Sequence, residues 1–576
     1  MRARDREIIA EPSDSSSGLI AEDMVNIADL LKAQLATPER ILYRQYLDGG
    51  WRDISTRDIA VFAARWQAFL RAQGFATGDR VALCLKNGIH WVAADQAALA
   101  LGLVVVPLYV DDNPENVAFC LENSGARLLV VETGRMADAL SKLGPAAPRI
   151  LCVTAESGSG HEQIESALPK EAPEFEVVPL DEGTLATICY TSGTVGRPKG
   201  VMLTHGNILA NVSACERTRL ARPDDVFLSF LPLSHMFERT GGYYLPLSLG
   251  AKVAYARSVS QLAEDLASER PTVIFAVPRV FERFASRVNE ALAKSPARKW
   301  LFELVVAAGG RAARGEAGMI DRLVLALLRR RIASPVLARL GGRMRIAVIG
   351  GAPLDPAIAR LFLGLGLHVL QGYGMTEASP VISVNRLENN VPESVGVPLD
   401  NVEVKVGAGG ELLARGPSIM KGYWNLPDAT AKTLDSEGWL HTGDLAELRE
   451  GKIFISGRLK DVLVLSNGEK LPPQDVEIAI LGDPVFEQGI LIGEGRPFLT
   501  LITVTRETDE RSLIHRANER LRGLPRYIRV RRVIPTRDPW TVENGLLTPT
   551  LKVKREQVQK KFGRNIEAAY ASGALD

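Results

Sequence analysis

The residues with the clearest chemical potential form one short loop, Tyr190–Gly200, with the sequence YTSGTVGRPKG. The loop holds three glycines, three Ser or Thr hydroxyls and a lysine; it follows an apolar run, LATICY, and precedes the helix-like stretch THGNILANV. Backbone N–H groups, hydroxyls and an ammonium are the donors that wrap phosphate oxygens. It is not a Walker A loop, because Pro198 precedes Lys199 where that motif needs a glycine. Composition and context favour a phosphate-binding loop over the alternative, a glycine-rich surface turn.

Four further segments follow in order and combine glycine, aromatic and charged residues. They are Gln371–Glu377 (QGYGMTE), Gly438–Asp444 (GWLHTGD), Gly457–Asp461 (GRLKD) and Thr548–Lys552 (TPTLK). Together with the phosphate loop, they resemble the motif series of the adenylate-forming superfamily, over nearly the whole chain. The flanking segments LPLSHMFERTGGYY, FAVPRVFERF, GGAPLD and ENGLLTPTLKVKR resemble the long-chain fatty acyl-CoA synthetase branch in particular.

This resemblance implies a reaction in two halves that uses ATP, Mg²⁺ and coenzyme A. A fatty acid carboxylate attacks the α-phosphate of ATP, and the acyl-adenylate then passes its acyl group to the coenzyme A thiol. The first half joins two anions, so cations and N–H donors must surround the phosphates. Two alternatives stay open: a fatty acyl-AMP ligase that loads a carrier protein, and a catalytically idle scaffold at a membrane or in a complex. We see no obvious insertion of the kind carrier-loading relatives carry, and the intact motifs argue against a scaffold.

The resemblance assigns the nucleotide contacts to three segments. The phosphate loop would contribute Thr191, Ser192, Gly193, Thr194, Gly196 and Lys199. The second motif would contribute Gln371, Gly372, Tyr373, Gly374, Met375 and Thr376, with the Tyr373 ring against adenine and Thr376 at the α-phosphate. The other face of adenine would meet Gly351, Ala352 and Pro353, which taken alone form a strand-to-helix turn. Glu377 and Thr191 would hold Mg²⁺, because that ion prefers hard oxygen ligands; taken alone, Glu377 could equally be an acid at a helix start.

Two later motifs are expected to meet the ribose and to join the domains. Asp444 matches the carboxylate that accepts hydrogen bonds from ribose hydroxyls, although a lone Asp in a loop is usually a turn former. Arg458 would contact ribose or phosphate. Lys460 occupies the hinge position, and Gly457 beside it permits backbone angles that other residues resist.

The predicted catalytic residues come from distant parts of the chain. Lys552 matches the family's C-terminal lysine, whose long stem lets an ammonium bridge carboxylate and phosphate oxygens. Leu551 stands where many members have glycine, and Lys554 is a local competitor. His235 would lie beside the acyl pocket, although a histidine in an apolar stretch is more often a core residue. The catalytic set expected from the resemblance is Lys552, Thr376, Glu377 and His235.

The elements that must position these residues alternate between buried strands and helices. Apolar runs without alternation are typical of strands covered on both faces; they occur at Arg80–Lys86, Leu103–Val110, Arg127–Glu132, Arg149–Val153, Leu185–Tyr190, Asp225–Phe230, Ala251–Tyr255, Pro271–Val277, Arg345–Ile349 and Leu367–Leu370. Helical patterns lie between them, for example at Trp91–Leu101, Pro114–Ser124 and Gln261–Ser268. The order predicts an α/β fold of several layers.

The predicted domains are unequal in size. Residues 1–25 would form a flexible lead-in and residues 26–456 a large AMP-binding domain of two α/β subdomains. Glycine-rich alternating sequence at 391–456 predicts a β-rich subdomain within that domain, a small antiparallel β-barrel or sheet. Residues 457–461 would be a hinge, and 462–576 a smaller, mobile α+β domain.

Composition narrows the class of protein. The 576 residues carry 69 Lys and Arg against 68 Asp and Glu, so the net charge of +1 argues against a dedicated nucleic-acid binder. The five cysteines are scattered without C-x-x-C, which fits reduced thiols rather than a disulfide framework. No secretory pattern or membrane-spanning run is visible. We therefore expect a cytoplasmic protein, with peripheral contact to the inner face of a membrane left open.

The balanced net charge includes two basic regions. In Met319–Arg345, leucines recur at helical spacing beside Arg329, Arg330 and Arg331. This pattern fits either an amphipathic helix on an anionic membrane or a core-packing helix with a solvated basic face. In Arg516–Arg537, the alternation of RYIRVRRVI predicts an edge strand whose charges discourage aggregation. Some of these arginines could instead meet the phosphates of coenzyme A.

Overall fold

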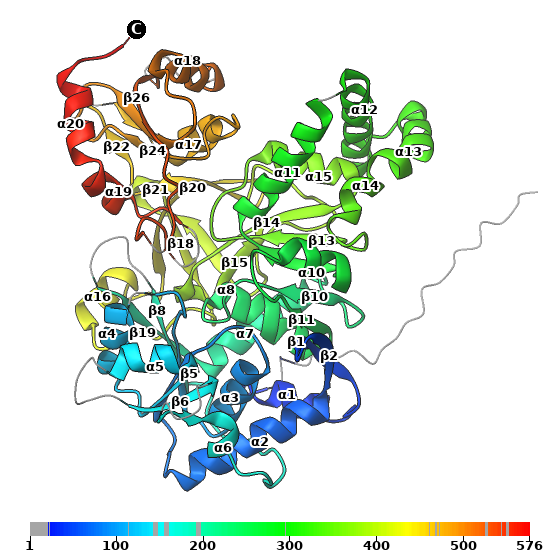
Figure 1. The fold of residues 1–576 in the computed structure, drawn as a ribbon, viewed down its shortest axis with the longest axis vertical. Helices are drawn as coiled ribbons and strands as arrows, with labels where there is room; N and C mark the ends of the chain where they lie inside the picture. Colours follow the sequence, from blue (N-terminus) through cyan, green and yellow to red (C-terminus); the bar gives the residue numbers. More distant parts are fainter. Residues whose placement is uncertain are drawn as a thin grey trace, which may run out of the picture.

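A computed structural model describes residues 21, 24–112, 114–141, 148–154, 160–191, 197–293, 295–459, 461–466, 469–471, 473–522, 524, 528–542, 544–548 and 552–575. The chain builds a large layered α/β body, a β-rich lobe beside it, and a small C-terminal unit that lies over one end of the body (Figure 1). Most of the predicted lead-in lies outside the described residues.

One sheet of the body has eight strands and carries the start of the phosphate loop. Its centre is parallel and its β9 edge is antiparallel. The strands, in spatial order, are β19 (Gly422–Tyr423), β9 (Lys199–Thr204), β8 (Leu185–Thr191), β4 (Val104–Pro107), β3 (Arg80–Cys84), β5 (Leu128–Thr133), β6 (Arg149–Thr154) and β7 (Glu162–Gln163).

The other sheet of the body has nine strands and carries the second motif. Its parallel centre is flanked by antiparallel strands at both edges. The strands, in spatial order, are β16 (Val397–Pro398), β15 (Val381–Val384), β14 (His368–Gly374), β13 (Ile346–Ile349), β12 (Val273–Ala276), β10 (Val226–Ser229), β11 (Lys252–Tyr255), β1 (Ile41–Leu47) and β2 (Gly50–Ser55).

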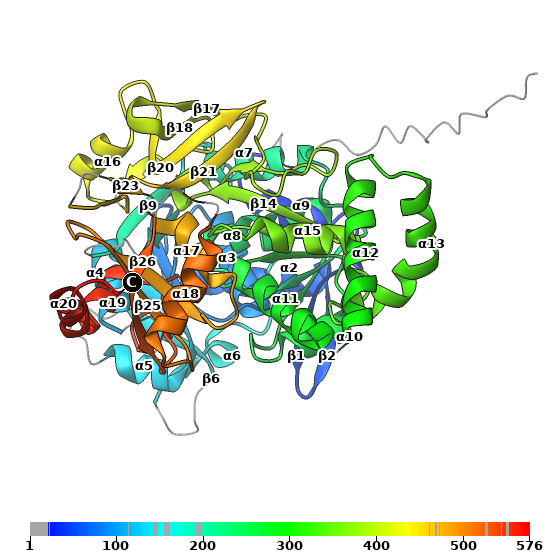
Figure 2. The same ribbon diagram turned by 90° about the horizontal axis from the view of Figure 1, so that it is seen from above.

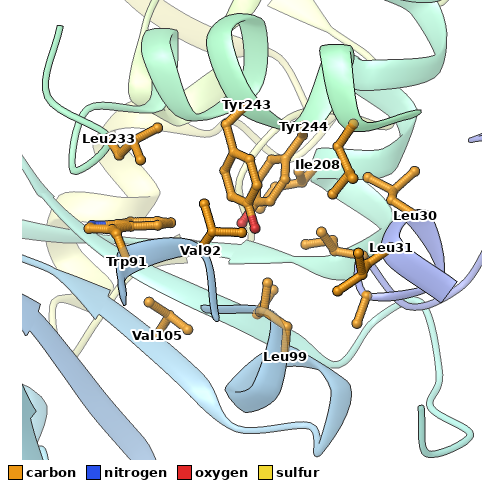
Figure 3. Packing of buried hydrophobic residues seen from close by; sticks show 14 of the residues in the cluster. Leu30, Leu31, Trp91, Val92, Leu99, Val105, Ile208, Leu233, Tyr243 and Tyr244 are labelled. Atoms are coloured by element: carbon orange, nitrogen blue, oxygen red, sulfur yellow. The ribbon is translucent and has the colours of Figure 1, made fainter. Parts of the chain in front are cut away.

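The main hydrophobic core lies between these two sheets and is filled by helices. Figure 3 shows Trp91, Leu99, Ile208, Tyr243 and Tyr244 meeting there from three helical segments. These central helices are α1 (Asp29–Gln34), α2 (Thr56–Ala72), α3 (Ile89–Ala100), α7 (His205–Arg217), α8 (Met236–Glu238), the π-helix η2 (Arg239–Tyr244) and α9 (Leu245–Leu249). Burial on both faces explains why the strands read as continuous apolar runs.

Further helices cover the outer faces of both sheets. The nine-stranded sheet packs against α10 (Leu262–Glu269), α11 (Pro278–Ala293) and α15 (Pro356–Leu365). The eight-stranded sheet packs against α4 (Pro114–Ser124) and α5 (Gly134–Ser141), with α6 (Ile164–Ala167) near its edge. Outside α15 lie α12 (Pro296–Ala313), α13 (Met319–Ile332) and α14 (Ser334–Ala338), which project from the body (Figures 1 and 2).

The β-rich lobe and the C-terminal unit complete the chain. The lobe is an antiparallel sheet with a helix beside it: β17 (Glu403–Val406), β18 (Glu411–Arg415), β20 (Leu440–Arg449), β21 (Lys452–Arg458) and α16 (Pro427–Thr433). The C-terminal unit holds two small sheets, β22 (Leu463–Val464) with β23 (Lys470–Leu471), and β24 (Gln488–Ile492), β25 (Leu499–Val504) and β26 (Val530–Thr536). Its helices are α17 (Pro473–Leu481), α18 (Glu510–Arg520), α19 (Arg555–Lys561) and α20 (Gly563–Ala571).

The α/β prediction is confirmed, and each predicted strand of the body is present. The expected small barrel or sheet is seen, in the described residues, as a four-stranded sheet that packs on Tyr373 and Val395. The helix expected at THGNILANV is present as α7, but a strand that was not predicted lies between it and the phosphate loop. This strand, β9, pairs with β8 and places Lys199 on a strand, so the loop joins a β-hairpin. Helix α7 begins later, where Thr204 and Asn207 form a capping box.

The basic stretch near residue 530 forms the edge strand β26, as the alternation predicted. Its arginines are engaged locally: Arg532 donates to Glu510 at 2.7 Å and Arg529 donates to the Leu521 carbonyl at 2.9 Å. Arg516 pairs with Asp483 at 2.6 Å. The described geometry therefore gives these side chains structural roles, and contact with coenzyme A stays a prediction.

Candidate active site

One cavity of about 1530 Å³ gathers most of the predicted residues. It lies where strand ends of both large sheets, the β-rich lobe and the C-terminal unit face one another. The predicted residues that line it are Thr191, Lys199, His235, Gly351, Ala352, Pro353, Gly372, Tyr373, Gly374, Met375, Thr376, Glu377, Asp444, Arg458 and Lys552. Ser192, Gly193, Thr194, Gly196 and Lys460 lie outside the described residues. Residues up to 361 positions apart in the sequence therefore line the same cavity, because the fold brings them together.

A carboxylate corner forms where β14 meets the lobe. Asp444 and Arg458 are cross-strand partners in β20 and β21, and Arg458 Nε donates to Asp444 Oδ1 at 3.1 Å. Tyr373 Oη donates to Asp444 Oδ2 at 2.5 Å. Burial raises the pKa of Asp444, while Arg458 and Tyr373 oppose that rise. The corner can still accept further hydrogen bonds, since a carboxylate offers about four acceptor positions.

A second carboxylate faces the phosphate hairpin. Glu377 lies in the short 3₁₀ helix η3 (Thr376–Ala378), is buried, and accepts a hydrogen bond at Oε1 from Tyr423 Oη at 2.8 Å. Tyr423 belongs to β19, which pairs with β9, and Lys199 Nζ lies 4.8 Å from its ring centroid. One aromatic side chain thus links the predicted metal ligand to the predicted phosphate lysine.

The donor chemistry at this point fits Mg²⁺. The described residues hold no cluster of three or more His, Cys, Asp or Glu that could bind a metal by themselves. Mg²⁺ is usually held by one or two carboxylates together with phosphate oxygens and water. Glu377, with the hydroxyl of Thr191 on the facing hairpin, supplies that kind of partial oxygen set.

Lys552 reaches the cavity from the C-terminal unit. Its backbone is held by hydrogen bonds with Thr548, and a Cβ built on Gly351 would lie 3.9 Å from its Cε atom. Although the residue as a whole is exposed, burial of its tip lowers the pKa of Lys552 to about 8; Arg458 adds to the decrease and Asp444 opposes it. The competitor Lys554 also lines the cavity, but the charge coupled to Asp444 and His235 is that of Lys552.

His235 is neutral and fixed in orientation. It caps α8, and its Nδ1 accepts a hydrogen bond from the Phe237 N–H at 3.2 Å. Burial, helped by Lys552, lowers the pKa of His235 to about 3. Because Nδ1 is the acceptor, the ring hydrogen sits on Nε2, so the side chain offers one N–H donor to its surroundings.

The structure does not bring every predicted side chain to the cavity. The Gln371 amide accepts from the Leu354 N–H at 2.9 Å and donates to the Pro392 carbonyl, so it braces the turn beneath the site. Gly374 does line the cavity, and a Cβ there would collide with the Pro380 carbonyl, so this glycine also permits close packing of β14 against β15. The Gln371 side chain supports the motif from behind, because its polar groups are satisfied by the protein itself.

The same cavity is also lined by apolar side chains. They come from the segment after α7, from α9 and from the nine-stranded sheet, and they are Leu220, Leu245, Val273, Phe275, Ile346 and Val348. Ligand sites are typically apolar with a few placed polar groups, and their usual volume is about 300–1,000 Å³. This cavity is larger than that and is lined by both charged and apolar side chains.

Comparison with known proteins identifies the family. Residues 31–424 match the family model described as AMP-binding enzyme, and residues 460–574 match the AMP-binding enzyme C-terminal domain. The chain therefore belongs to the AMP-binding enzymes, the adenylate-forming superfamily.

Named relatives fall within the same group. A long-chain-fatty-acid–CoA ligase, FadD15 of Mycobacterium bovis, is 30% identical over 92% of this chain and 95% of its own. A long-chain-fatty-acid–[acyl-carrier-protein] ligase, AEE15 of the chloroplast of Arabidopsis thaliana, is 28% identical over 87% of this chain and 80% of its own. Among solved structures, the adenylation domain of a carboxylate reductase from Mycobacterium chelonae has a TM-score of 0.78, 24% identity, and coverage of 97% and 93%.

Proposed function

We propose that this protein activates a long-chain fatty acid with ATP and transfers the acyl group to coenzyme A. The observation that carries the proposal is one cavity lined by Glu377, Asp444 and Lys552 and also by His235 and a set of apolar side chains. The relatives named as long-chain-fatty-acid–CoA ligases support this choice of substrate and acceptor.

In the proposed first half, the nucleotide lies between the two sheets. Asp444 accepts hydrogen bonds from the ribose hydroxyls, and Lys199 with the hairpin backbone holds the outer phosphates. Glu377 and Thr191 would hold Mg²⁺, which when bound neutralises phosphate charge. The fatty acid carboxylate, with its chain against the apolar side chains, forms a bond to the α-phosphorus, and the bond to pyrophosphate breaks. Lys552 stabilises the charge on the carboxylate and α-phosphate oxygens during this step.

In the proposed second half, the coenzyme A sulfur bonds to the acyl carbon, and the bond to AMP breaks with loss of the thiol proton. We propose that residues 457–461 act as a hinge for this step and that 462–576 rotate as a unit. Gly457 has φ of 154°, a backbone angle that side-chain-bearing residues rarely adopt. The gap between the two family models, after residue 424 and before residue 460, is consistent with this division.

A direct assay tests the proposal. AMP release is measured with ATP, Mg²⁺ and fatty acids of graded length, with coenzyme A or with a holo acyl carrier protein as acceptor. We expect thioester formation with coenzyme A and the highest kcat/KM for long chains. Thioester on the carrier protein alone would favour the carrier-loading function that AEE15 represents. If no thioester formed on either acceptor, only an adenylating or scaffold function would remain, and the proposal would be contradicted.

The site of action is a separate question. Among the helices that the structure describes, none is long and apolar enough to cross a bilayer. We propose peripheral contact with a membrane instead.

A further inference from the structure

Helix α13 has one face turned toward the molecule and an apolar face that is open to solvent. One face turns toward α12, where Asp321 pairs with Arg311, Nε to Oδ2 at 2.9 Å. The other face is open: Ile320, Leu323 and Leu327 are 76%, 59% and 63% exposed, and Met319 at the helix start is 88% exposed. Residues 320, 323 and 327 follow the spacing of a single helical stripe. A helix that packs a core on one face would normally present polar residues on the other.

The core-packing interpretation of this region therefore accounts for only one of its faces. The other contributes to a surface that we call the α13 face, defined as Met319, Ile320, Leu323, Leu327, Arg330 and Arg331. Figures 1 and 2 show α12 and α13 side by side at the edge of the molecule, with α13 outermost. Trp300, near the start of α12, is 63% exposed. Clustered exposed apolar side chains of this kind mark an interaction site in soluble proteins.

The charges around the stripe are positive. Arg330 and Arg331 follow Leu327 by three and four residues, so they end the same stripe, and both are exposed. Arg329 differs, because its guanidinium packs against Gly366 at the end of α15. The acid of α13, Asp321, is already paired with Arg311, and the nearby Glu316 is paired with Arg314 at 2.8 Å. The face thus combines apolar side chains with uncompensated arginines.

We infer that the α13 face docks on the surface of a bilayer that contains anionic lipids. Leucine, isoleucine and methionine would enter the boundary between headgroups and acyl chains, while the arginines meet lipid phosphates. A tryptophan beside such a helix suits the same boundary, since its ring is both apolar and able to donate a hydrogen bond. This inference stands on the surface alone and does not depend on the proposed reaction.

A second copy of the chain fits the face less well. Two copies related by a two-fold axis would set Arg330 and Arg331 against the partner's apolar stripe or against its arginines. No acid of α13 is available to compensate them, because Asp321 is buried and engaged. A bilayer with negatively charged lipids supplies both the apolar layer and the opposite charge.

Flotation with vesicles tests the inference. Full-length protein is mixed with vesicles of equal parts phosphatidylcholine and phosphatidylglycerol, or with phosphatidylcholine alone, at low and high salt. We expect binding to the anionic vesicles that weakens with salt. The double substitution Leu323→Gln and Leu327→Gln should lower the partition coefficient at least tenfold. The double charge reversal Arg330→Glu and Arg331→Glu should lower it about tenfold or more, on anionic vesicles only.

Matched controls separate this surface from general stickiness. Val61→Gln replaces another exposed apolar residue on α2, and Lys170→Glu with Arg506→Glu reverses two charges elsewhere. Thermal melting confirms that each variant is folded. Equal binding of the α13 variants and the controls, or no binding by the wild type, would overturn the inference. The inference would also be overturned if the wild type did not bind vesicles but formed a dimer by light scattering, and if the double variant Leu323→Gln and Leu327→Gln were a monomer.

Discussion

At the scale of single residues, the site brings together two acids, a lysine and a neutral histidine whose properties depend on one another. Lys552 and Asp444 oppose each other's shifts in pKa, and Lys552 helps to keep His235 neutral. A lysine with a lowered pKa and a desolvated carboxylate in the same cavity are typical of a catalytic centre.

Lys552→Ala should abolish adenylation but leave the second half-reaction in place. The ammonium is proposed to act on the carboxylate and α-phosphate, and the thiol attack on a preformed adenylate does not require it. We expect a loss of at least about 100-fold in acid-dependent pyrophosphate exchange, given the usual effect of removing one placed donor. Thioester formation from supplied acyl-adenylate should change little. Lys554→Ala is the matched control, and a larger loss there would transfer the role to Lys554.

The pH profile should report the lowered pKa of Lys552. The amine is charged below its pKa, so kcat/KM for adenylation should be level below about pH 8 and fall above it, well short of the ordinary value of 10.5. In Lys552→Arg the guanidinium stays charged throughout, so whatever activity remains should lack this alkaline fall. If the arginine variant falls at the same pH, another group controls the profile.

Tyr423→Phe should weaken the use of Mg²⁺ more than it lowers the stability of the folded protein. The hydroxyl orients Glu377 through a 2.8 Å hydrogen bond, whereas the ring beside Lys199 is kept in phenylalanine. Loss of such a supporting bond typically costs about 10- to 100-fold in metal affinity or activity. We expect the Mg²⁺ concentration at half-maximal rate to rise about tenfold or more. Tyr46→Phe, which removes an exposed hydroxyl bond far from the site, should leave it unchanged.

The motifs predicted which residues would converge but not how each is supported. Tyr423 was missed, because its partner Glu377 is 46 residues away and the sequence between them gives no sign of the contact. Gln371 was predicted to meet the nucleotide, yet its amide is used by the turn at Leu354 and by Pro392. Such assignments depend on long-range packing, and a motif records only that a residue type is needed.

At the scale of elements, the phosphate hairpin and the central helices are tied by a buried ion pair. Arg239 of η2 donates to Asp95 of α3 at 2.5 Å and to Thr187 of β8 at 2.9 Å. Tyr243 and Tyr244 also donate to Asp95, at 3.1 and 3.0 Å. Strand β8 runs from this network to Thr191, so the network fixes the strand that starts the phosphate loop.

Asp95→Leu should therefore destabilise the protein by about 3–5 kcal/mol, because it leaves the Arg239 charge buried without its partner. The double variant Asp95→Leu with Arg239→Met should recover part of that loss, since no charge then remains in the core. The measurement is the shift in the urea midpoint or the melting temperature. Asp53→Ala, which breaks an exposed pair with Arg44, should cost less than about 1 kcal/mol. A double variant as unstable as the single would show that shape, rather than charge, dominates.

Elements buried on both faces were predictable, whereas several at edges and on the periphery were not. Runs such as VVVP of β4 and IAVI of β13 are apolar throughout because helices cover both faces. The edge hairpin of β1 and β2 was missed, since ILYRQYL and GWRDIS mix polar and apolar residues without a clear period. Strand β9 was missed because its six residues merge with the start of α7. The exposure of α13 could not be predicted, because its leucines repeat as a core helix's would.

At the scale of the whole molecule, the predicted site residues come together as one set only while the C-terminal unit lies over the body. Lys552 comes from that unit, whereas Gly351, Glu377 and Asp444 come from the body and lobe. The two parts also touch directly, with Arg279 of α11 donating to the Glu487 carbonyl at 3.5 Å. A ligand that meets both parts should hold them in this arrangement, and one that meets only the body should not.

A non-hydrolysable acyl-adenylate analogue should therefore stabilise the protein as one unit. At about 100 times its Kd, the linked stabilisation is about 2.7 kcal/mol, seen as a rise in melting temperature. Hydrogen exchange should slow both in β14 and β20 and in residues 552–558, because the analogue's acyl and linker oxygens face Lys552. Adenosine, which lacks those oxygens, should protect the body strands alone, and Lys552→Ala should limit the analogue to the same pattern. Protection of 552–558 by adenosine, or none by the analogue in the wild type, would show that the closed arrangement does not depend on the contact between Lys552 and the bound adenylate.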